Sequence, residues 1–193
     1  MINTAAQYWN TERVKIVVVG DGGVGKTALL CSFTTNTFEE DYLPTVFENF
    51  TAGINFKGRY LTLSIWDTAG QEEYSRLRAL SYPDTNIFFL CFDVTKKHSF
   101  TNVRDRWYTE IMHHCPDAKL LLIGTKSDLR DSRSVTEPAA KVMASFLNTK
   151  YCECSAKTQQ GLQAVFETGL QMIMEQTPKE ENNTCKKRKC LLL

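Results

Sequence analysis

The chain has 193 residues, of which 42% are hydrophobic and 23% charged, and its formal net charge is +1. This length and composition predict a single globular domain with a sizeable core, and no apolar run is long enough to span a bilayer. Four of the 23 basic residues lie at positions 186–189, so the rest of the chain is mildly acidic, which argues against a nucleic-acid partner.

Three segments are expected from composition: a flexible N-terminal extension at residues 1–12, a folded domain at 13–177, and a polar, basic tail at 178–193. The N-terminus has neither the basic nor the apolar region of a secretory signal. The seven cysteines include no C-x-x-C pair. We therefore expect a reduced, cytosolic protein without a zinc site.

Strands and helices alternate along the chain. Apolar runs predict strands at residues 14–19, 45–56, 61–66, 86–93, 120–124 and 151–154. The runs at 87–92 and 120–123 do not alternate, which is typical of parallel strands buried on both faces, and the turn at 56–60 predicts an antiparallel hairpin. Helices are expected at residues 26–34, 99–113, 138–148 and 162–175. The fold class predicted is α/β, a doubly wound six-stranded, mostly parallel sheet with one antiparallel edge hairpin and helices on both faces.

A glycine-rich loop joins the first strand to the first helix. Residues 20–27 read Gly-Asp-Gly-Gly-Val-Gly-Lys-Thr and match the phosphate-binding pattern G-x-x-x-x-G-K-[ST]. Backbone N–H groups of such a loop and of the following helix N-terminus converge on a polyphosphate. Lys26 adds a positive charge between the β- and γ-phosphates, and the Thr27 hydroxyl can ligate Mg²⁺.

Polar residues follow the third strand. Asp67 at the strand end is suited to hold Mg²⁺ through water, and Gly70 allows a backbone N–H to approach the γ-phosphate. The Gln71 amide can orient an attacking water, because it both donates and accepts hydrogen bonds.

Two further loops end the fifth and sixth strands and point to guanine. The Asp128 carboxylate can accept from the paired N–H donors of guanine, whereas adenine would leave it unpaired. The Lys126 stem is expected along the base, and the backbone N–H of Ala156 can donate to guanine O6. A phosphate-loop kinase or ATPase shares the first motif but gives no reason for these two loops.

These motifs, in this order, resemble the Ras superfamily of small GTPases and within it the Rho/Rac family. The Rho character lies in residues 42–50, 66–74, 76–78 and 80–83, and in Thr125. The resemblance implies a switch between GDP- and GTP-bound states, with Gln71, Lys26 and Thr45 in catalytic roles. It implies a nucleotide-binding set of Gly22, Gly23, Val24, Gly25, Lys26, Thr27, Ala28, Phe38, Tyr42, Pro44, Thr45, Gly70, Thr125, Lys126, Asp128, Ser155, Ala156 and Lys157.

The same resemblance implies metal and partner sites. Mg²⁺ would be held by Thr27, by Thr45 and, through water, by Asp67. Effectors would contact Tyr42, Leu43, Pro44, Thr45, Val46, Phe47, Glu48, Tyr74, Arg76 and Leu77. Arg76 and Arg78 belong to a segment that the family uses for partner contacts. The partners implied are exchange factors, GTPase-activating proteins, a GDP-dissociation inhibitor (GDI), and Rho-type effectors such as kinases, formins or other cytoskeletal regulators, with the protein itself a monomer.

The chain departs from the Rho pattern between Asp128 and Cys154. Rho-family members carry an additional helix of about a dozen residues there, and residues 131–134 are too short to form it. Gly23 stands where these proteins usually have alanine, which we expect to be benign. Gln71 is retained, so hydrolysis is expected; the alternative is a constitutively GTP-bound scaffold.

The last four residues, Cys-Leu-Leu-Leu from Cys190, fit the C-a-a-X pattern for a geranylgeranyl lipid. The preceding basic run supplies a second attraction to an anionic membrane surface. We expect the protein at the cytoplasmic face of the plasma membrane with a cytosolic pool.

Overall fold

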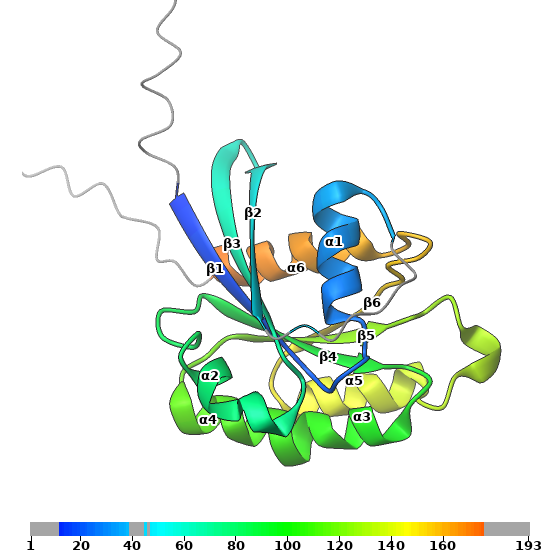
Figure 1. The fold of residues 1–193 in the computed structure, drawn as a ribbon. Helices are drawn as coiled ribbons and strands as arrows, with labels where there is room; N and C mark the ends of the chain where they lie inside the picture. The colour runs from blue at the N-terminus through cyan, green and yellow to red at the C-terminus, as the bar shows by residue number, and fades with distance from the viewer. Residues whose placement is uncertain (1–11, 39–44, 46, 176–193) are drawn as a thin grey trace, which may run out of the picture.

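The computed structural model describes residues 12–38, 45 and 47–175, and these residues form one six-stranded sheet (Figure 1). The strand order across the sheet is β2-β3-β1-β4-β5-β6, and every neighbouring pair is parallel except β2 with β3. The predicted doubly wound α/β sheet with one antiparallel edge hairpin is therefore confirmed. The strands are β1 Glu12–Val19, β2 Phe47–Phe56, β3 Arg59–Thr68, β4 Ile87–Asp93, β5 Leu120–Thr125 and β6 Lys150–Glu153.

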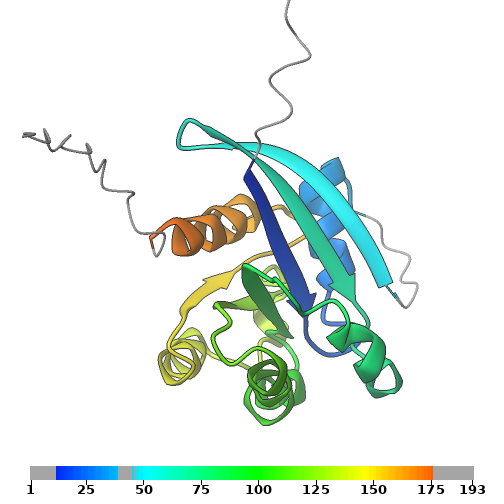
Figure 2. The same ribbon diagram turned by 90° about the vertical axis from the view of Figure 1, so that its left-hand side faces the viewer.

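Helices cover both faces of this sheet (Figure 2). They are α1 Lys26–Thr35, α2 Ser75–Ala79, α3 Lys97–Asn102, α4 Thr109–His114, α5 Glu137–Phe146 and α6 Leu162–Met174, with 3-10 turns η2 Glu72–Tyr74 and η4 Arg130–Ser132 and a π-helical turn η3 Val103–Tyr108. Since α3, η3 and α4 follow one another without a break, residues 97–114 form one long helix, close to the predicted 99–113.

The alternation of β1 divides the core into two layers. Ile16 and Val18 pack with residues of α1 and α6, including Leu30 and Phe166, whereas Val17 and its neighbours pack with η3, α4 and α5 on the other face. Strands β4 and β5 are buried along their whole length. This agrees with the unalternating apolar runs, because a central parallel strand has no solvent face.

Two short elements differ from the sequence expectations. The η2 and α2 helices after Gly70 were not predicted, because eight residues are too few for a helical period to be recognised. The region between Asp128 and β6 contains only the three-residue turn η4 before α5, so the expected absence of room for an insert helix matches the observed length. Arg133 closes this region by a bidentate ion pair with Glu153, at 2.9 and 2.5 Å.

Among the described helices, none is both long and apolar enough to cross a membrane. Among the described cysteines, Cys91, Cys115, Cys152 and Cys154 are free thiols, and Cys91 and Cys154 are buried in the core. Residues 1–11 of the predicted N-terminal extension and the basic tail at 178–193 lie outside the described residues, whereas Glu12, which was predicted to belong to the extension, is the first residue of β1.

Candidate functional site

The glycine-rich loop leaves β1 at Gly20 and enters α1 at Lys26. Gly20 has φ 145°, and a Cβ at this position would lie 2.2 Å from the backbone oxygen of Cys91 on β4. Only glycine fits such a contact, so the first turn of the loop is fixed against the sheet. The N-cap of α1 is Gly25, which has no side chain with which to cap the first helical turn. The N–H groups of that turn are therefore available to an anion.

Lys26 reaches back under this loop. The residue is 6% exposed, and its ammonium donates to the backbone oxygens of Gly20 at 2.8 Å and of Asp21 at 3.0 Å. Burial lowers the pKa of Lys26, against the opposing effect of Asp67. A buried cation that is bonded to two carbonyl oxygens of this loop is suited to bind a phosphate, which is the role that the sequence predicts for Lys26.

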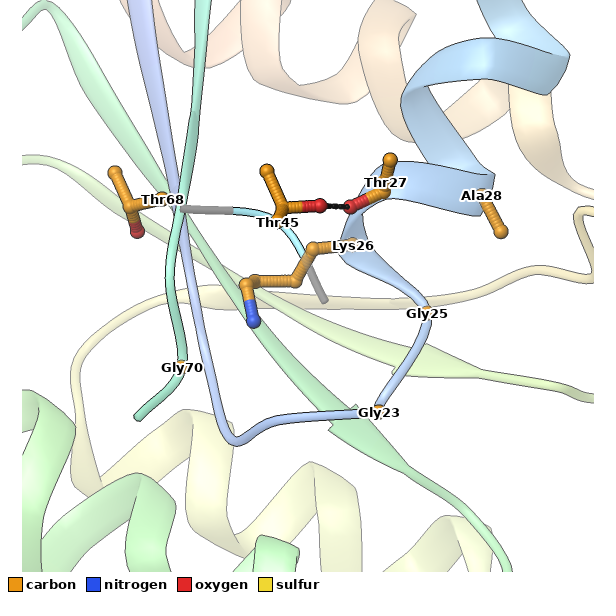
Figure 3. Close-up of a pocket in the computed structure, with 8 residues that line it drawn as sticks. All are labelled: Gly23, Gly25, Lys26, Thr27, Ala28, Thr45, Thr68 and Gly70. Atoms are coloured by element: carbon orange, nitrogen blue, oxygen red, sulfur yellow. Dashed lines mark hydrogen bonds between the residues drawn. The ribbon is translucent and has the colours of Figure 1, made fainter. Parts of the chain in front are cut away.

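A cavity opens between this loop and the segment that follows β3 (Figure 3). It is lined by Gly23, Gly25, Lys26, Thr27, Ala28, Thr45, Thr68 and Gly70. Gly70 is pressed against the loop, because a Cβ on it would lie 2.3 Å from the nitrogen of Gly22 and 2.5 Å from the oxygen of Gly20. The structure therefore joins three segments that are far apart in the sequence: the glycine-rich loop, Thr45 and the end of β3.

Oxygen atoms from these three segments form a compact cluster. The Thr27 hydroxyl lies 2.6 Å from the Thr45 hydroxyl and 2.5 Å from Oδ2 of Asp67. The second carboxylate oxygen of Asp67 is buried and has no hydrogen-bond partner among the described residues. Burial raises the pKa of Asp67 to about 6, although the bond from Thr27 and the charge of Lys26 act in the opposite direction.

This cluster fits a hard divalent cation. Hydroxyl and carboxylate oxygens are the ligands that Mg²⁺ prefers, and an unpaired buried carboxylate oxygen is costly unless a cation compensates it. The residues present are the three named in the sequence prediction: Thr27, Thr45 and Asp67.

The two loops predicted to bind the base lie side by side. Ser127 donates its backbone N–H to the oxygen of Cys154 at 3.1 Å, and Ser32 of α1 donates to the oxygen of Ala156 at 2.8 Å. Ser155 is buried, and Asp128 is half-buried. The structure thus brings Asp128 and Ala156 to one edge of the sheet, next to the first helix, as expected from strand ends in a parallel sheet.

Thr125 and Lys126 connect this edge to the glycine-rich loop. The Thr125 hydroxyl donates to Val24 at 2.6 Å, and the Lys126 ammonium donates to Gly23 at 2.8 Å. The same ammonium forms an ion pair with Asp93 at 2.8 Å. Burial alone would raise the pKa of Asp93, but bonds from Lys126 and Thr95 outweigh it and hold the pKa below its ordinary value. Lys126 is therefore fixed across the gap between the phosphate and base regions.

The remaining predicted residues are half-buried, exposed or outside the described residues. Lys157 and Gln71 are exposed, and Phe38 is 37% exposed. Of the predicted effector residues, Tyr74 is half-buried, whereas Phe47, Glu48, Arg76 and Leu77 are exposed. Tyr42, Leu43, Pro44, Val46 and Cys190 lie outside the described residues.

Arg78 contradicts the expectation of a partner contact. Its side chain is 0% exposed and forms a bidentate ion pair with Glu110 of α4, both distances being 2.8 Å. Burial alone would raise the pKa of Glu110, but bonds from Arg78 and Tyr82 outweigh it and lower the pKa. Arg78 is turned inward because α4 supplies a carboxylate there, which the local sequence around Arg78 does not indicate.

We expect the Glu110→Gln variant to be less stable by about 3 kcal/mol at pH 7, because it leaves the buried guanidinium uncompensated. The difference should be complete above the ordinary carboxyl pKa of 4.5 and should shrink as pH falls below it, since a depressed pKa stabilises the fold only while the carboxylate is charged. Urea unfolding of both proteins between pH 4 and pH 7 measures this.

Glu137→Gln is the matched control. Glu137 pairs with Lys141 at the surface, with side-chain exposures of 55% and 65%, so its loss should change stability by less than about 0.5 kcal/mol. Equal losses in the two variants, or a pH-independent loss at Glu110, would contradict the buried pair.

Several residues that support the site are not predicted from the sequence. Asp21 accepts hydrogen bonds from Asn102 and from the Trp107 indole, each at 2.7 Å, and so fixes the glycine-rich loop to the long helix. Asp93, which holds Lys126, was assigned only to a strand. Asn102 and Trp107 are 81 and 86 residues away from Asp21 in the sequence. The local signal for these contacts was therefore limited to the acidic side chain at the second position of the loop.

The strand order, the glycine-rich loop and the polar strand ends define a class of protein: an α/β nucleoside-phosphate-binding domain of the phosphate-loop type. A family model described as the Ras family matches residues 15–175, and the chain belongs to this family. Ras-family small GTPases are molecular switches that bind GTP or GDP with Mg²⁺, hydrolyse GTP, and interact with exchange factors, GTPase-activating proteins and effectors.

Proposed function

We propose that this protein is a Rho-type switch, a slow GTP hydrolase that binds effectors while GTP is bound. The observation that carries the proposal is the meeting of Thr45 and Gly70 with the glycine-rich loop at one cavity. Both segments would contact the third phosphate, so its removal changes their environment. Partners that read these segments then distinguish the two nucleotide states.

Several residues of the chain have roles in the proposed hydrolysis. Lys26 offsets negative charge on the phosphates, and the backbone N–H of Thr45 would donate to the γ-phosphate. The exposed Gln71 amide accepts from and donates to the attacking water, holding it in line with the bond that breaks. Thr27, Thr45 and Asp67 would hold Mg²⁺, which would supply positive charge beside the phosphates.

No described arginine lines the cavity, and Arg78 is committed to Glu110. The site therefore has Lys26 but no arginine at the transition state, and an arginine supplied by a partner is expected to accelerate hydrolysis about 10³–10⁵-fold. This supports a slow intrinsic rate of GTP hydrolysis that a partner protein controls.

Gln71→Leu is expected to slow intrinsic hydrolysis by about 10-fold or more while nucleotide binding is kept, because the water loses its orienting amide and the fold loses nothing. The measurement is phosphate release in a single turnover from the full chain loaded with GTP and Mg²⁺. A wild-type chain that releases phosphate as slowly as the variant would favour the alternative, a constitutively GTP-bound scaffold.

The Rho-type assignment rests on the switch sequences at residues 42–50 and 66–74, and on Thr125. It includes a role in regulating the actin cytoskeleton and partners such as a GDI, kinases and formins. A GTP-loaded chain that captures such regulators, while the GDP-loaded chain does not, would support this part of the proposal.

Location is part of the same proposal. A geranylgeranyl group on Cys190 and the basic run before it would bind an anionic membrane surface, since one lipid needs a second signal for stable anchoring. The protein would then act at the cytoplasmic face of the plasma membrane.

A further inference from the structure

Arg78 bonds to two different parts of the protein. Through Nε and Nη2 it binds both carboxylate oxygens of Glu110 on α4, and Glu110 also accepts the Tyr82 hydroxyl at 2.6 Å. Through Nη1 it donates to the backbone oxygens of Ala69 at 2.5 Å and of Gln71 at 3.2 Å. A planar guanidinium can make these contacts together because its donors point in fixed directions.

The two carbonyls that Arg78 binds lie on either side of Gly70. Gly70 itself is packed against the glycine-rich loop, with no room for a Cβ beside Gly22 and Gly20. Residues 69–71 are therefore held from both sides, by the loop and by the guanidinium. Gln71 is exposed, so the position of its side-chain amide depends on where this backbone holds its Cα atom.

The long helix behind Arg78 also contacts the glycine-rich loop. Trp107 lies in the π-helical turn η3, with its ring 4.6 Å from the Arg78 guanidinium and its N–H bonded to Asp21 at 2.7 Å. Glu110 follows three residues later, so it lies on the same face of the helix. One buried helix face thus fixes the loop under the phosphates and, through Arg78, the backbone that carries Gln71.

We propose that Arg78 is a positioning residue for GTP hydrolysis: anchored by Glu110, it fixes the backbone at Ala69 and Gln71 and thereby places the Gln71 amide relative to the phosphate loop. The inference rests on the proposed hydrolytic function and assigns that function a residue outside the cavity. Nucleotide affinity comes from other groups, so Arg78 acts on the rate of the chemical step.

The test is Arg78→Lys in the full chain, with single-turnover hydrolysis of bound GTP and dissociation of GDP as readouts. A lysine ammonium keeps the charge beside Glu110 but cannot span the carboxylate and both carbonyls. We expect hydrolysis to slow by about 10-fold, since a displacement of about 1 Å can cost about 10²-fold. GDP dissociation should stay within about threefold of wild type, and Arg78→Lys combined with Gln71→Leu should be no slower than Gln71→Leu alone, because residues acting through one group are non-additive.

Arg104→Lys is the matched control. Arg104 lies on the same long helix and is exposed, and its ion pair is with its neighbour Asp105 at 2.7 Å, so Arg104→Lys should leave hydrolysis unchanged. Should Arg78→Lys fold poorly, Glu110→Asp replaces it, because the shorter side chain keeps the charge beside Arg78 but not the two-point contact, and the same slower hydrolysis and the same double variant with Gln71→Leu apply.

The outcomes separate the two proposals. A wild-type chain without GTP hydrolysis overturns the proposed function and this inference together. If wild type hydrolyses GTP and Gln71→Leu slows it, an unchanged rate in Arg78→Lys overturns the positioning role alone. A rate loss that adds in full to that of Gln71→Leu, or that comes with fast GDP release, also overturns it and leaves Arg78 a structural residue.

Discussion

Asp128→Asn is expected to exchange the base preference of the protein from guanine to xanthine. A carboxylate accepts from both N1–H and the exocyclic amine of guanine, whereas an amide presents one acceptor and one donor. Xanthine has the complementary pair, an N1–H donor and a carbonyl at C2. The amide nitrogen would face the guanine amine donor to donor, and we expect the ratio of GDP to XDP affinity to change by about 10³-fold or more.

The structure supports this expectation through the setting of Asp128. Its loop is bonded to the loop of Ala156 through Ser127 and Cys154, and Lys126 in the same loop is held by Asp93 and Gly23. A loop fixed at several points cannot move to accommodate a mismatched base. The carboxylate is thereby committed to one geometry.

Competition of GDP, XDP and ADP against a bound fluorescent GDP analogue measures the preference. Asp131→Asn is the control, since Asp131 is an exposed aspartate three residues further along and has no expected contact with the base. An unchanged GDP-to-XDP ratio in Asp128→Asn, or an equal change in Asp131→Asn, would show that Asp128 does not bind the base.

The parts of the fold that were predictable are those with a local signal. The unalternating runs in β4 and β5 predicted buried parallel strands, and the turn before Arg59 predicted the one antiparallel pair. The glycine-rich loop carries its own recognition pattern. Because strand ends in a parallel sheet meet at one edge, placing Asp67, Asp128 and Ala156 required only the strand order.

The parts that were not predictable depend on contacts between distant residues. Arg76 and Arg78 are the same residue type and lie two positions apart, yet Arg78 is buried and Arg76 is exposed. The difference arises because Glu110 forms an ion pair with Arg78. Nothing near Asp21 indicates that an indole 86 residues away will donate to it. Such pairings follow from how the long helix packs, which a single sequence does not encode locally.

Lys26→Met is expected to weaken nucleotide binding by about 10³-fold while leaving the metal- and nucleotide-free fold nearly as stable as wild type. The binding loss follows from removing a buried positive charge, with a charge-assisted bond worth about 1.5–3 kcal/mol to each phosphate that it contacts. Methionine has a similar length and fills the same space.

Stability should change little because two effects oppose each other. Lys26 is 6% exposed, so removing the ammonium relieves a desolvation cost, which is also why burial lowers the pKa of this residue. The oxygens of Gly20 and Asp21 lose a donor in return, at about 1–3 kcal/mol each. We expect the net change in unfolding free energy to lie within about 2 kcal/mol.

Chemical unfolding of the nucleotide-free protein and titration with GDP separate the two quantities. Lys141→Met is the control, because Lys141 is exposed and pairs only weakly with Glu137, so neither quantity should change. A Lys26→Met protein that binds GDP as wild type does would remove the lysine from the phosphate site. A protein that loses stability and binding together would make Lys26 a structural support of the loop, held in place by its two carbonyls whether or not a phosphate is bound.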